Sequence, residues 1–213
     1  ENSPIGTVVG LPLEAMDPDI GQFHLYTMIR NTHGDLFKLG ACSGQLEVAV
    51  AALDFETRDL YDLLVTVTDD GVDPYHLSDE AAVRVIVIDV NEPPEIHDAV
   101  RRVDENTAVG VEFGEPLVGT DVDANQTLTY TLQEPRDDNG ALFINSSTGV
   151  LRVARDQLDF ETQPVYTVTV QVADNGVDPH PMSDTATLTV YLNDVNEPPG
   201  SLPISAPIWW MIF

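Results

Sequence analysis

The sequence Leu-Asp-Phe-Glu-Thr at residues 53–57 recurs without change at residues 158–162, and this repetition decides how the chain is organised. Four further elements repeat in the same order, with an offset of 104 or 105: Glu-Asn at 1 and 105, Asp-x-Asp at 17 and 121, Asp-Asp/Asn-Gly-Val-Asp-Pro at 69 and 174, and Asp-Val-Asn-Glu-Pro-Pro at 89 and 194. Five matches with one period indicate two homologous domains.

The repetition also sets the expected domain boundaries. We expect a first repeat over residues 1–94, a second over residues 95–199, and an apolar tail over residues 200–213. Residues 95–104 have no counterpart in front of Glu1, so the first repeat is expected to lack its first strand. Because the chain begins with Glu1 and shows no signal peptide, we interpret it as a fragment of a longer protein.

Runs of β-branched and aromatic residues between the repeated elements predict strands. Residues 61–67 and 165–170 are such runs, and residues 82–90 and 185–192 have the same character up to the Asp-Val-Asn-Glu-Pro-Pro element. No segment longer than one turn sustains a helical period. About seven short strands in about 100 residues favour a small antiparallel β-sandwich, so we predict an all-β chain of two such domains in tandem.

The charge of the chain is strongly acidic. Its 213 residues include 36 acidic and 9 basic side chains, which gives a formal net charge of −27. This negative charge excludes binding to nucleic-acid phosphates, which needs clustered Lys and Arg, and it disfavours unaided binding to anionic lipid. The single cysteine, Cys42, excludes an intramolecular disulfide framework and a Cys-cluster zinc or iron–sulfur site.

The repeated acids lie beside predicted strand ends or in turns. In a short loop, residues i and i+2 can both turn towards one cation, so Asp-x-Asp and Asp-x-Glu suit a hard ion that takes oxygen ligands. Ca²⁺ accepts about six to eight oxygens in flexible geometry, whereas Mg²⁺ demands a stricter octahedron. Several carboxylates with no His or Cys nearby therefore point to Ca²⁺. The alternative is that the acids only solvate the surface, as in a high-salt proteome, but a solvated face does not need the same elements twice.

The combination of these elements resembles the cadherin extracellular repeat. The matching order is Glu-Asn-x-Pro-x-Gly-Thr, Asp-x-Asp, Leu-Asp-aromatic-Glu, Asp-x-Gly and Asp-x-Asn-Asp/Glu before Pro, and it covers residues 1–199. The resemblance implies two tandem seven-stranded Greek-key β-sandwiches, stacked end to end. It also implies calcium ions at each junction, with ligands from the base of the upper domain, the linker and the top of the lower domain.

The complete junction implied by the resemblance is the central one. Its ligands, in that order, would be Glu1, Asp54 and Glu56; Val90 through its carbonyl, Asn91 and Glu92; and Asp121, Asp123, Asn125 and Asp174. Seven of these are carboxylates, so three Ca²⁺ would bring the junction close to neutrality. Without the metal, the carboxylates would repel one another and the linker should loosen.

Two half-sites are implied as well, and neither is expected to hold a full calcium set in this fragment. They are Asp17, Asp19 and Asp69 at the top of the first repeat, and Glu105, Asp159, Glu161, Asn196 and Glu197 at the base of the second. The linker departs from the family pattern, because Glu92 stands where the family has Asp and Pro93 follows at once. This puts the ion nearest the lower domain in doubt.

Other motifs suggest little chemistry. The five histidines show no metal spacing, and no phosphate-binding loop, dinucleotide fingerprint or Gly-x-Ser-x-Gly motif is present. Asp54 and Glu56 could serve a glycosidase, but their duplication beside other acids favours metal. Of two N-glycosylation sequons, Asn145-Ser146-Ser147 is the expected acceptor, because the one at residues 125–127 lies in the presumed calcium loop. The apolar residues 204–213 are too short to span a bilayer, which takes roughly 20 residues.

Two functional hypotheses follow, and neither is an enzyme. The first is a calcium-rigidified extracellular fragment of a membrane-anchored, glycosylated adhesion protein, which pairs homophilically with other cadherin-like ectodomains at cell–cell contacts. The second is a spacer or carbohydrate-binding array of a secreted protein. A membrane-spanning helix elsewhere in the full gene would favour the first, and linked carbohydrase or sugar-binding domains would favour the second.

Overall fold

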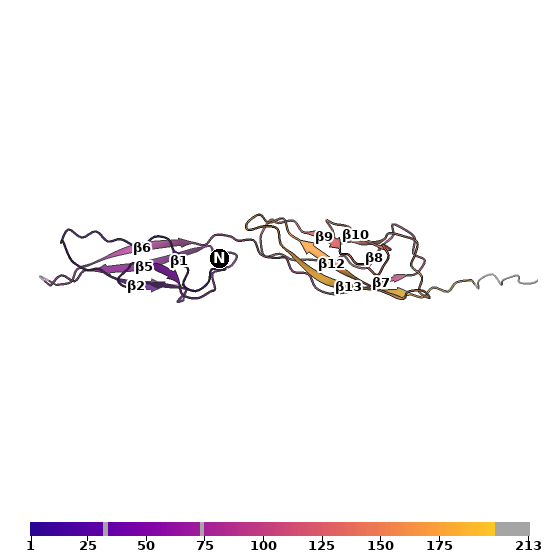
Figure 1. The fold of residues 1–213 in the computed structure, drawn as a ribbon, viewed down its shortest axis with the longest axis horizontal. Coiled ribbons are helices and arrows are strands. Elements are labelled where there is room, and N and C mark those ends of the chain that lie inside the picture. Colours follow the sequence, from indigo (N-terminus) through magenta and orange to yellow (C-terminus); the bar gives the residue numbers. More distant parts are fainter. Residues whose placement is uncertain (32–33, 73–74, 199–213) are drawn as a thin grey trace, which may run out of the picture. The chain divides into compact units, whose positions relative to one another are not determined.

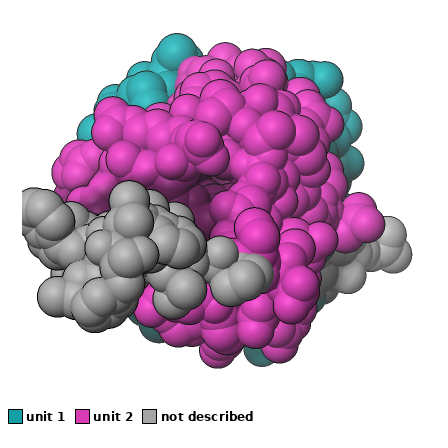
Figure 2. All heavy atoms as spheres, turned by 90° about the vertical axis from the view of Figure 1, so that its right-hand side faces the viewer, with its two compact units in different colours: residues 1–92, 122–125, 176–181 teal, residues 93–121, 126–175, 182–213 magenta. Residues whose placement is uncertain are grey.

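The computed structural model describes residues 1–31, 34–72 and 75–198, and its secondary structure there is strand throughout (Figure 1). The apolar tail and one of the five histidines, His33, lie outside the described residues. Since the described residues form no helix, none of them forms a helix able to cross a membrane. The chain divides into two compact units (Figure 2). Unit 1 comprises residues 1–92, 122–125 and 176–181, and unit 2 comprises residues 93–121, 126–175 and the chain from 182.

Unit 1 contains two three-stranded antiparallel sheets. Their orders are β1-β4-β3 and β2-β5-β6. The strands are β1 (Val8–Val9), β2 (Leu25–Asn31), β3 (Phe37–Leu39), β4 (Leu46–Val48), β5 (Leu60–Thr68) and β6 (Ser78–Ile86). Buried apolar side chains from both sheets form one core, including Phe37 and Val48 from the first sheet and Leu63 and Val85 from the second.

The described residues of unit 2 form a seven-stranded sandwich. Its sheets have the orders β7-β13-β12-β9 and β10-β11-β8, and β7 runs parallel to β13 while the other pairs are antiparallel. The strands are β7 (Ala99–Asp104), β8 (Glu112–Phe113), β9 (Thr129–Leu132), β10 (Leu142–Ile144), β11 (Leu151–Val153), β12 (Val165–Ala173) and β13 (Ser183–Asn193).

The alternation in β12 explains why its sequence forms a core strand. Tyr166, Val168, Val170 and Val172 are at most 3% exposed, while the residues between them face the other side of the sheet. Each such side chain stabilises the fold by about 1.5–3 kcal/mol through its burial. The prediction of β-sandwich domains is therefore confirmed for this unit, and its seven strands match the expected number.

One expected strand begins and ends earlier in the structure than the sequence pattern predicts. The run at residues 82–90 was expected to be strand throughout, but β6 extends from Ser78 to Ile86. Its polar start pairs with β5, with Glu80 opposite Thr66, because a sheet with one solvated face accepts polar residues. Beyond Ile86 the backbone leaves the ladder, and the N–H of Val87 donates to the carbonyl of Asp59.

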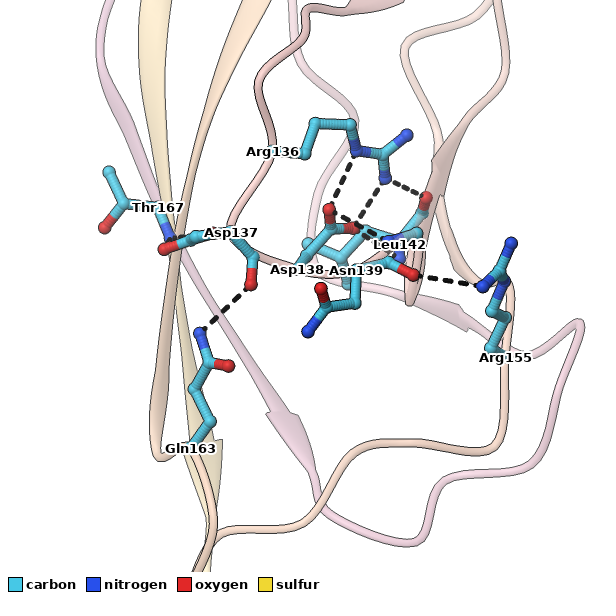
Figure 3. Close-up of polar contacts among 9 residues, drawn as sticks. Arg136, Asp137, Asp138, Asn139, Leu142, Arg155, Gln163 and Thr167 are labelled. Atoms are coloured by element: carbon cyan, nitrogen blue, oxygen red, sulfur yellow. Dashed lines mark hydrogen bonds and ion pairs between the residues drawn. The ribbon is translucent and has the colours of Figure 1, made fainter.

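A buried ion pair organises the connection between β9 and β10 in unit 2 (Figure 3). Asp138, whose side chain is fully buried, accepts hydrogen bonds from Arg136 Nε at 2.8 Å and from the Leu142 N–H at 2.8 Å. Burial alone would raise the pKa of Asp138, but the hydrogen bond from Arg136 and the backbone donors outweigh it and lower the pKa. The repeat pattern had not indicated this pair.

Candidate metal centre

One glutamate in each unit ties two chain segments together. Glu1 accepts the Phe55 N–H at 2.8 Å on one oxygen and the Val90 N–H at 2.7 Å on the other. Glu105 makes the equivalent bonds to the N–H groups of Phe160 and Val195, both at 2.8 Å. Each carboxylate therefore joins the Leu-Asp-Phe-Glu-Thr connection to the segment that follows the last strand of its repeat.

The Leu-Asp-Phe-Glu-Thr segment folds into a turn stabilised by its own side chains. Asp54 accepts from the N–H of Thr57 at 3.0 Å and from its hydroxyl at 2.8 Å. The hydroxyl hydrogen bond is the main reason why the pKa of Asp54 is lowered. Asp159 and Thr162 repeat the arrangement at 2.9 and 2.8 Å. The turn thus holds Asp54 ionised, with Glu56 two residues further on.

Two groups of carboxylates in unit 1 share one member. Glu1, Asp54 and Glu56 each offer an oxygen within 4.8 Å of the others, and so do Glu56, Glu92 and Asp123. The pKa of Glu56 is raised to about 7, first by desolvation and then by the charges of Glu1 and Glu92. This crowding of negative charge is what a bound cation would relieve.

Asp89 also belongs to this acidic region, and the sequence reasoning missed it. Its pKa is raised by desolvation first, and then by the charges of Asp123 and Glu1. The signal was present, because Asp89 is the first residue of the repeated Asp-Val-Asn-Glu-Pro-Pro element. An open depression of about 620 Å³ is lined in part by Glu56, Asp89 and Asn125, which gives ions access from solvent.

Asn91, the first linker residue in the expected ligand set, is buried and held by its neighbours. Its N–H donates to the Asp178 carbonyl at 2.7 Å, and its Nδ2 donates to the His180 carbonyl at 3.1 Å. A Cβ at Gly176 would lie 1.5 Å from Oδ1 of Asn91. A glycine is therefore required at residue 176 by the close approach of the Asn91 amide.

Glu92, the second linker residue, is fixed at its backbone and at one side-chain oxygen. Its N–H donates to Asp123 at 2.9 Å, and its Oε1 accepts from Asn2 Nδ2 at 2.7 Å. Its Oε2 is buried and has no hydrogen-bond partner among the described residues. A buried carboxylate oxygen without a donor is expensive unless a cation lies beside it.

The remaining expected ligands of the central set are placed as follows. Asn125 is exposed and has a φ of 67°. In unit 2, Asp121 is half-buried, and the buried Asp174 accepts the Met182 N–H at 2.9 and 3.1 Å on its two oxygens. Within unit 1, the structure thus brings together Glu1, Asp54, Glu56, Glu92 and Asp123.

The two expected half-sites differ from each other. At the top of the first repeat, Asp17 lies 3.5 Å from His24, and Asp69 accepts the N–H groups of Gly71 and Leu77. The carboxylate groups found among the described residues include none of Asp17, Asp19 and Asp69.

At the base of the second repeat, Glu105 and Glu161 form a third group, together with Asp194, which the sequence reasoning had not selected. A backbone hydrogen bond lowers the pKa of Glu161, but desolvation and then the charge of Glu105 act in the other direction, and the pKa is raised. Asp159 and Glu197 lie outside this group.

The donor chemistry of the unit 1 groups fits calcium. Both groups consist of carboxylates alone, which are hard oxygen ligands and suit Ca²⁺, whereas zinc and copper sites draw on His or Cys. The raised pKa of Glu56 and the buried Oε2 of Glu92 both indicate charge that lacks compensation.

Comparison with known proteins agrees with this architecture of repeated sandwiches with acidic ends. The family model of the cadherin domain matches residues 100–193. Mouse protocadherin Fat 4 is 35% identical over 209 residues, which cover 92% of this chain and 4% of that protein. Human cadherin-22 is 30% identical over 222 residues, which cover 96% of this chain and 27% of that protein. The chain thus spans about a quarter or less of these relatives.

Solved structures show the same fold. Extracellular repeats 1–3 of protocadherin gamma C5 align with a TM-score of 0.66 and 28% identity, over 89% of this chain and 62% of that one. The human desmocollin-1 ectodomain aligns with a TM-score of 0.62 and 26% identity, over 95% of this chain and 41% of that one. Residues 100–193 are therefore a cadherin domain, a kind of domain known as an extracellular adhesion module, and the similarity to cadherin ectodomains extends over about nine-tenths of the chain.

Proposed function

We propose that this chain is a calcium-binding part of an adhesion ectodomain. The observation that carries the proposal is Glu56, which two groups of carboxylates share and whose pKa is raised to about 7. An arrangement that leaves so much charge uncompensated is costly to a folded protein unless a cation is present. Bound calcium supplies that positive charge.

In this proposal the central site combines the unit 1 carboxylates with the two acids of unit 2. Glu1, Asp54, Glu56, Glu92 and Asp123 contribute carboxylates, and Asp89 joins them. Asp121 and Asp174 complete the set, since each is close in the chain to the unit 1 segments 122–125 and 176–181. Asn91, Asn125 and the Val90 carbonyl supply neutral oxygens.

The proposed consequence of calcium binding is mechanical. Repulsion among the carboxylates loosens the linker when the metal is absent. When calcium neutralises their charge, the repeats 1–94 and 95–199 are held as one rigid body. Affinity on the order of 10⁻⁴–10⁻³ M suits extracellular modules, where calcium is plentiful. The whole protein is proposed to be membrane-anchored, glycosylated at Asn145 and engaged with cadherin-like ectodomains of its own kind.

Small-angle scattering tests the mechanical role. We expect the distribution of intramolecular distances to narrow when calcium is added at millimolar concentration to protein in chelator, because the linker then samples fewer conformations. Glu56→Ala should respond to calcium much less than the parent. An identical distribution with calcium and with chelator would refute the stiffening, and calorimetry on the same samples would show separately whether calcium binds at all.

A further inference from the structure

An asparagine with an unusual backbone conformation follows the bridging glutamate in each repeat. Asn2 has a φ of 53° and Asn106 a φ of 55°. The left-handed region is costly for most residues, and Asn tolerates it better than other side chains apart from Gly. The N–H of Asn2 donates to the Leu53 carbonyl at 3.0 Å, and that of Asn106 to the Leu158 carbonyl at 3.0 Å.

The side chains of these two asparagines make the same bond. Asn2 Nδ2 donates to Glu92 Oε1 at 2.7 Å, and Asn106 Nδ2 donates to Glu197 Oε1 at 2.6 Å. Such short distances are typical of hydrogen bonds to an ionised acceptor. Because an amide carries no charge, it can donate to a glutamate in an acidic region without adding to the repulsion. The same hydrogen bond from asparagine to glutamate therefore occurs in equivalent places of the two repeats.

The side chain of Glu92 is flexible, so it must be ordered before its carboxylate can bind a cation. Its side chain has more rotatable bonds than Asp, and ordering a Glu side chain costs up to about 2 kcal/mol of conformational entropy. The hydrogen bond from Asn2 occupies Oε1, while Oε2 is buried without a hydrogen-bond partner among the described residues. A Glu92 oxygen lies within 4.8 Å of oxygens of Glu56 and Asp123.

We propose that Asn2 is a positioning residue, which holds the Glu92 carboxylate beside Glu56 and Asp123 so that it is already oriented when calcium binds. Asn106 does the same for Glu197, whose charge contributes to the raised pKa of Glu161. The inference rests on the proposed calcium function, and it assigns a role to a residue that is not itself a ligand.

A double-mutant cycle in calcium affinity tests the proposal. Asn2→Gly keeps the left-handed backbone accessible and removes only the amide, so the turn should survive. We expect calcium binding, measured by calorimetry, to weaken about threefold to tenfold, the effect of losing one hydrogen bond of ordinary net strength. In a Glu92→Ala background the same substitution should have no further effect. Asn106→Gly is the matched control and should leave the unit 1 affinity unchanged.

A second measurement, made in chelator, separates this inference from the calcium function. The free energies of unfolding of the parent, both single variants and the double variant give the coupling between Asn2 and Glu92 without any metal. The NMR signal of the Asn2 side-chain amide should also shift in Glu92→Ala and stay unchanged in Glu197→Ala. If the parent binds no calcium, the proposed function fails, and this coupling alone decides whether Asn2 holds Glu92.

Two results would overturn the proposal. An equal loss of calcium affinity from Asn2→Gly with and without Glu92 would show that Asn2 acts through the backbone turn. Zero coupling in chelator, together with an unshifted amide signal in Glu92→Ala, would show that the hydrogen bond does not form in solution.

Discussion

Glu56 is the side chain through which the two carboxylate groups of unit 1 are connected. It lies two residues after Asp54 in a turn closed by Thr57, and its carboxylate has both Glu1 and Glu92 as neighbours. A cation in either group would therefore use Glu56. The pKa of Glu56 is raised to about 7, first by desolvation and then by the charges of Glu1 and Glu92, because burial and nearby like charges both disfavour the ionised form.

We therefore predict that Glu56→Ala and Asp123→Ala lower calcium affinity far more than Asp19→Ala does. Glu56 serves two groups and Asp123 one, whereas Asp19 belongs to none of the groups found among the described residues. Asp19→Ala is a suitable control because it removes one negative charge in the same way. Calorimetric titration of the three variants measures the difference. An Asp19→Ala variant as impaired as Asp123→Ala would show that the ligands are wrongly assigned.

A second residue-scale prediction concerns Asp138, which is buried in unit 2 beside Arg136 (Figure 3). Asp138→Asn keeps the shape of the side chain but leaves the Arg136 charge without its partner, so we expect a loss of about 3 kcal/mol in the free energy of unfolding of this unit. Chemical denaturation at neutral pH, in chelator, measures it. Arg84→Gln, which breaks the exposed ion pair with Asp62, is the control and should cost under about 1 kcal/mol.

The same pair predicts a pH dependence. Because the pKa of Asp138 is lowered in the folded state, its contribution is complete above the unfolded pKa of about 3.9 and is lost as the pH falls through the folded value. The difference in stability between the parent and Asp138→Asn should thus be constant above about pH 5 and shrink below about pH 4. A difference that grows towards acid would contradict the lowered pKa.

At the scale of elements, β6 and β13 are equivalent strands in different environments. β13 lies between β12 and β7, whereas β6 pairs only with β5 in the part of the chain that the structure describes. The neighbouring core differs accordingly. Ala186 and Leu188 are buried, while Ala81 is exposed and Val83 is half-buried. The parallel strand β7 therefore both satisfies backbone groups and covers apolar side chains.

This difference predicts unequal hydrogen exchange. Amides at residues 83–86 that point away from β5 should exchange at least about tenfold faster than their counterparts at residues 188–191, because exposed backbone groups open at low free energy. In each unit the exchange rates are divided by that of a reference amide, Val65 in unit 1 and Val170 in unit 2. Both reference residues lie in strands that are paired on both sides. Equal corrected rates would mean that the edge of β6 is covered in solution.

At the scale of the whole molecule, the net charge of −27 opposes folding through self-repulsion. General screening by salt relieves some of this repulsion, but it does not distinguish the clustered carboxylates from those that are dispersed. Calcium binding, by contrast, stabilises the fold through the clustered carboxylates alone, because this stabilisation follows mass action at defined sites.

We predict that calcium raises the midpoint of thermal unfolding beyond what ionic strength explains. At ten times the dissociation constant, one site adds about 1.4 kcal/mol, which corresponds to a rise of several degrees for a domain of this size. Differential scanning calorimetry in calcium, in magnesium and in sodium chloride of equal ionic strength provides the comparison. The same midpoint in all three would indicate screening alone.

Repetition and strand pattern predicted the fold class, and the resemblance to the cadherin repeat selected the acidic residues of the proposed site. Glu1, Asp54 and Glu56 were identifiable because their elements occur twice in the same order, and the structure brings these three carboxylates together. Strand alternation likewise predicted β12, since its period of two depends only on which residues are apolar. These features are local or repeated, so they can be recognised without coordinates.

Other features depend on contacts between residues far apart in the chain. The raised pKa of Asp89 and the membership of Asp194 in a carboxylate group arise from desolvation and from charges that only the folded chain brings near. Arg136 and Asp138 are only two positions apart in the sequence, but the effect of the pair comes from burial, which no local pattern indicates.

The sequence by itself determined that this protein has repeated β-sandwich domains with acids at the strand ends, because hydrophobic period and repetition are properties of the chain alone. Only the tertiary structure decided which acids share a site and what holds them. Asn2 illustrates the difference, since the repeated Glu-Asn element can be read from the sequence, whereas the bond from Asn2 to Glu92 joins residues 90 positions apart. This bond forms because the fold brings the last residues of the repeat beside its first residues. The distances between these groups and their desolvation then determine their hydrogen bonds and pKa values.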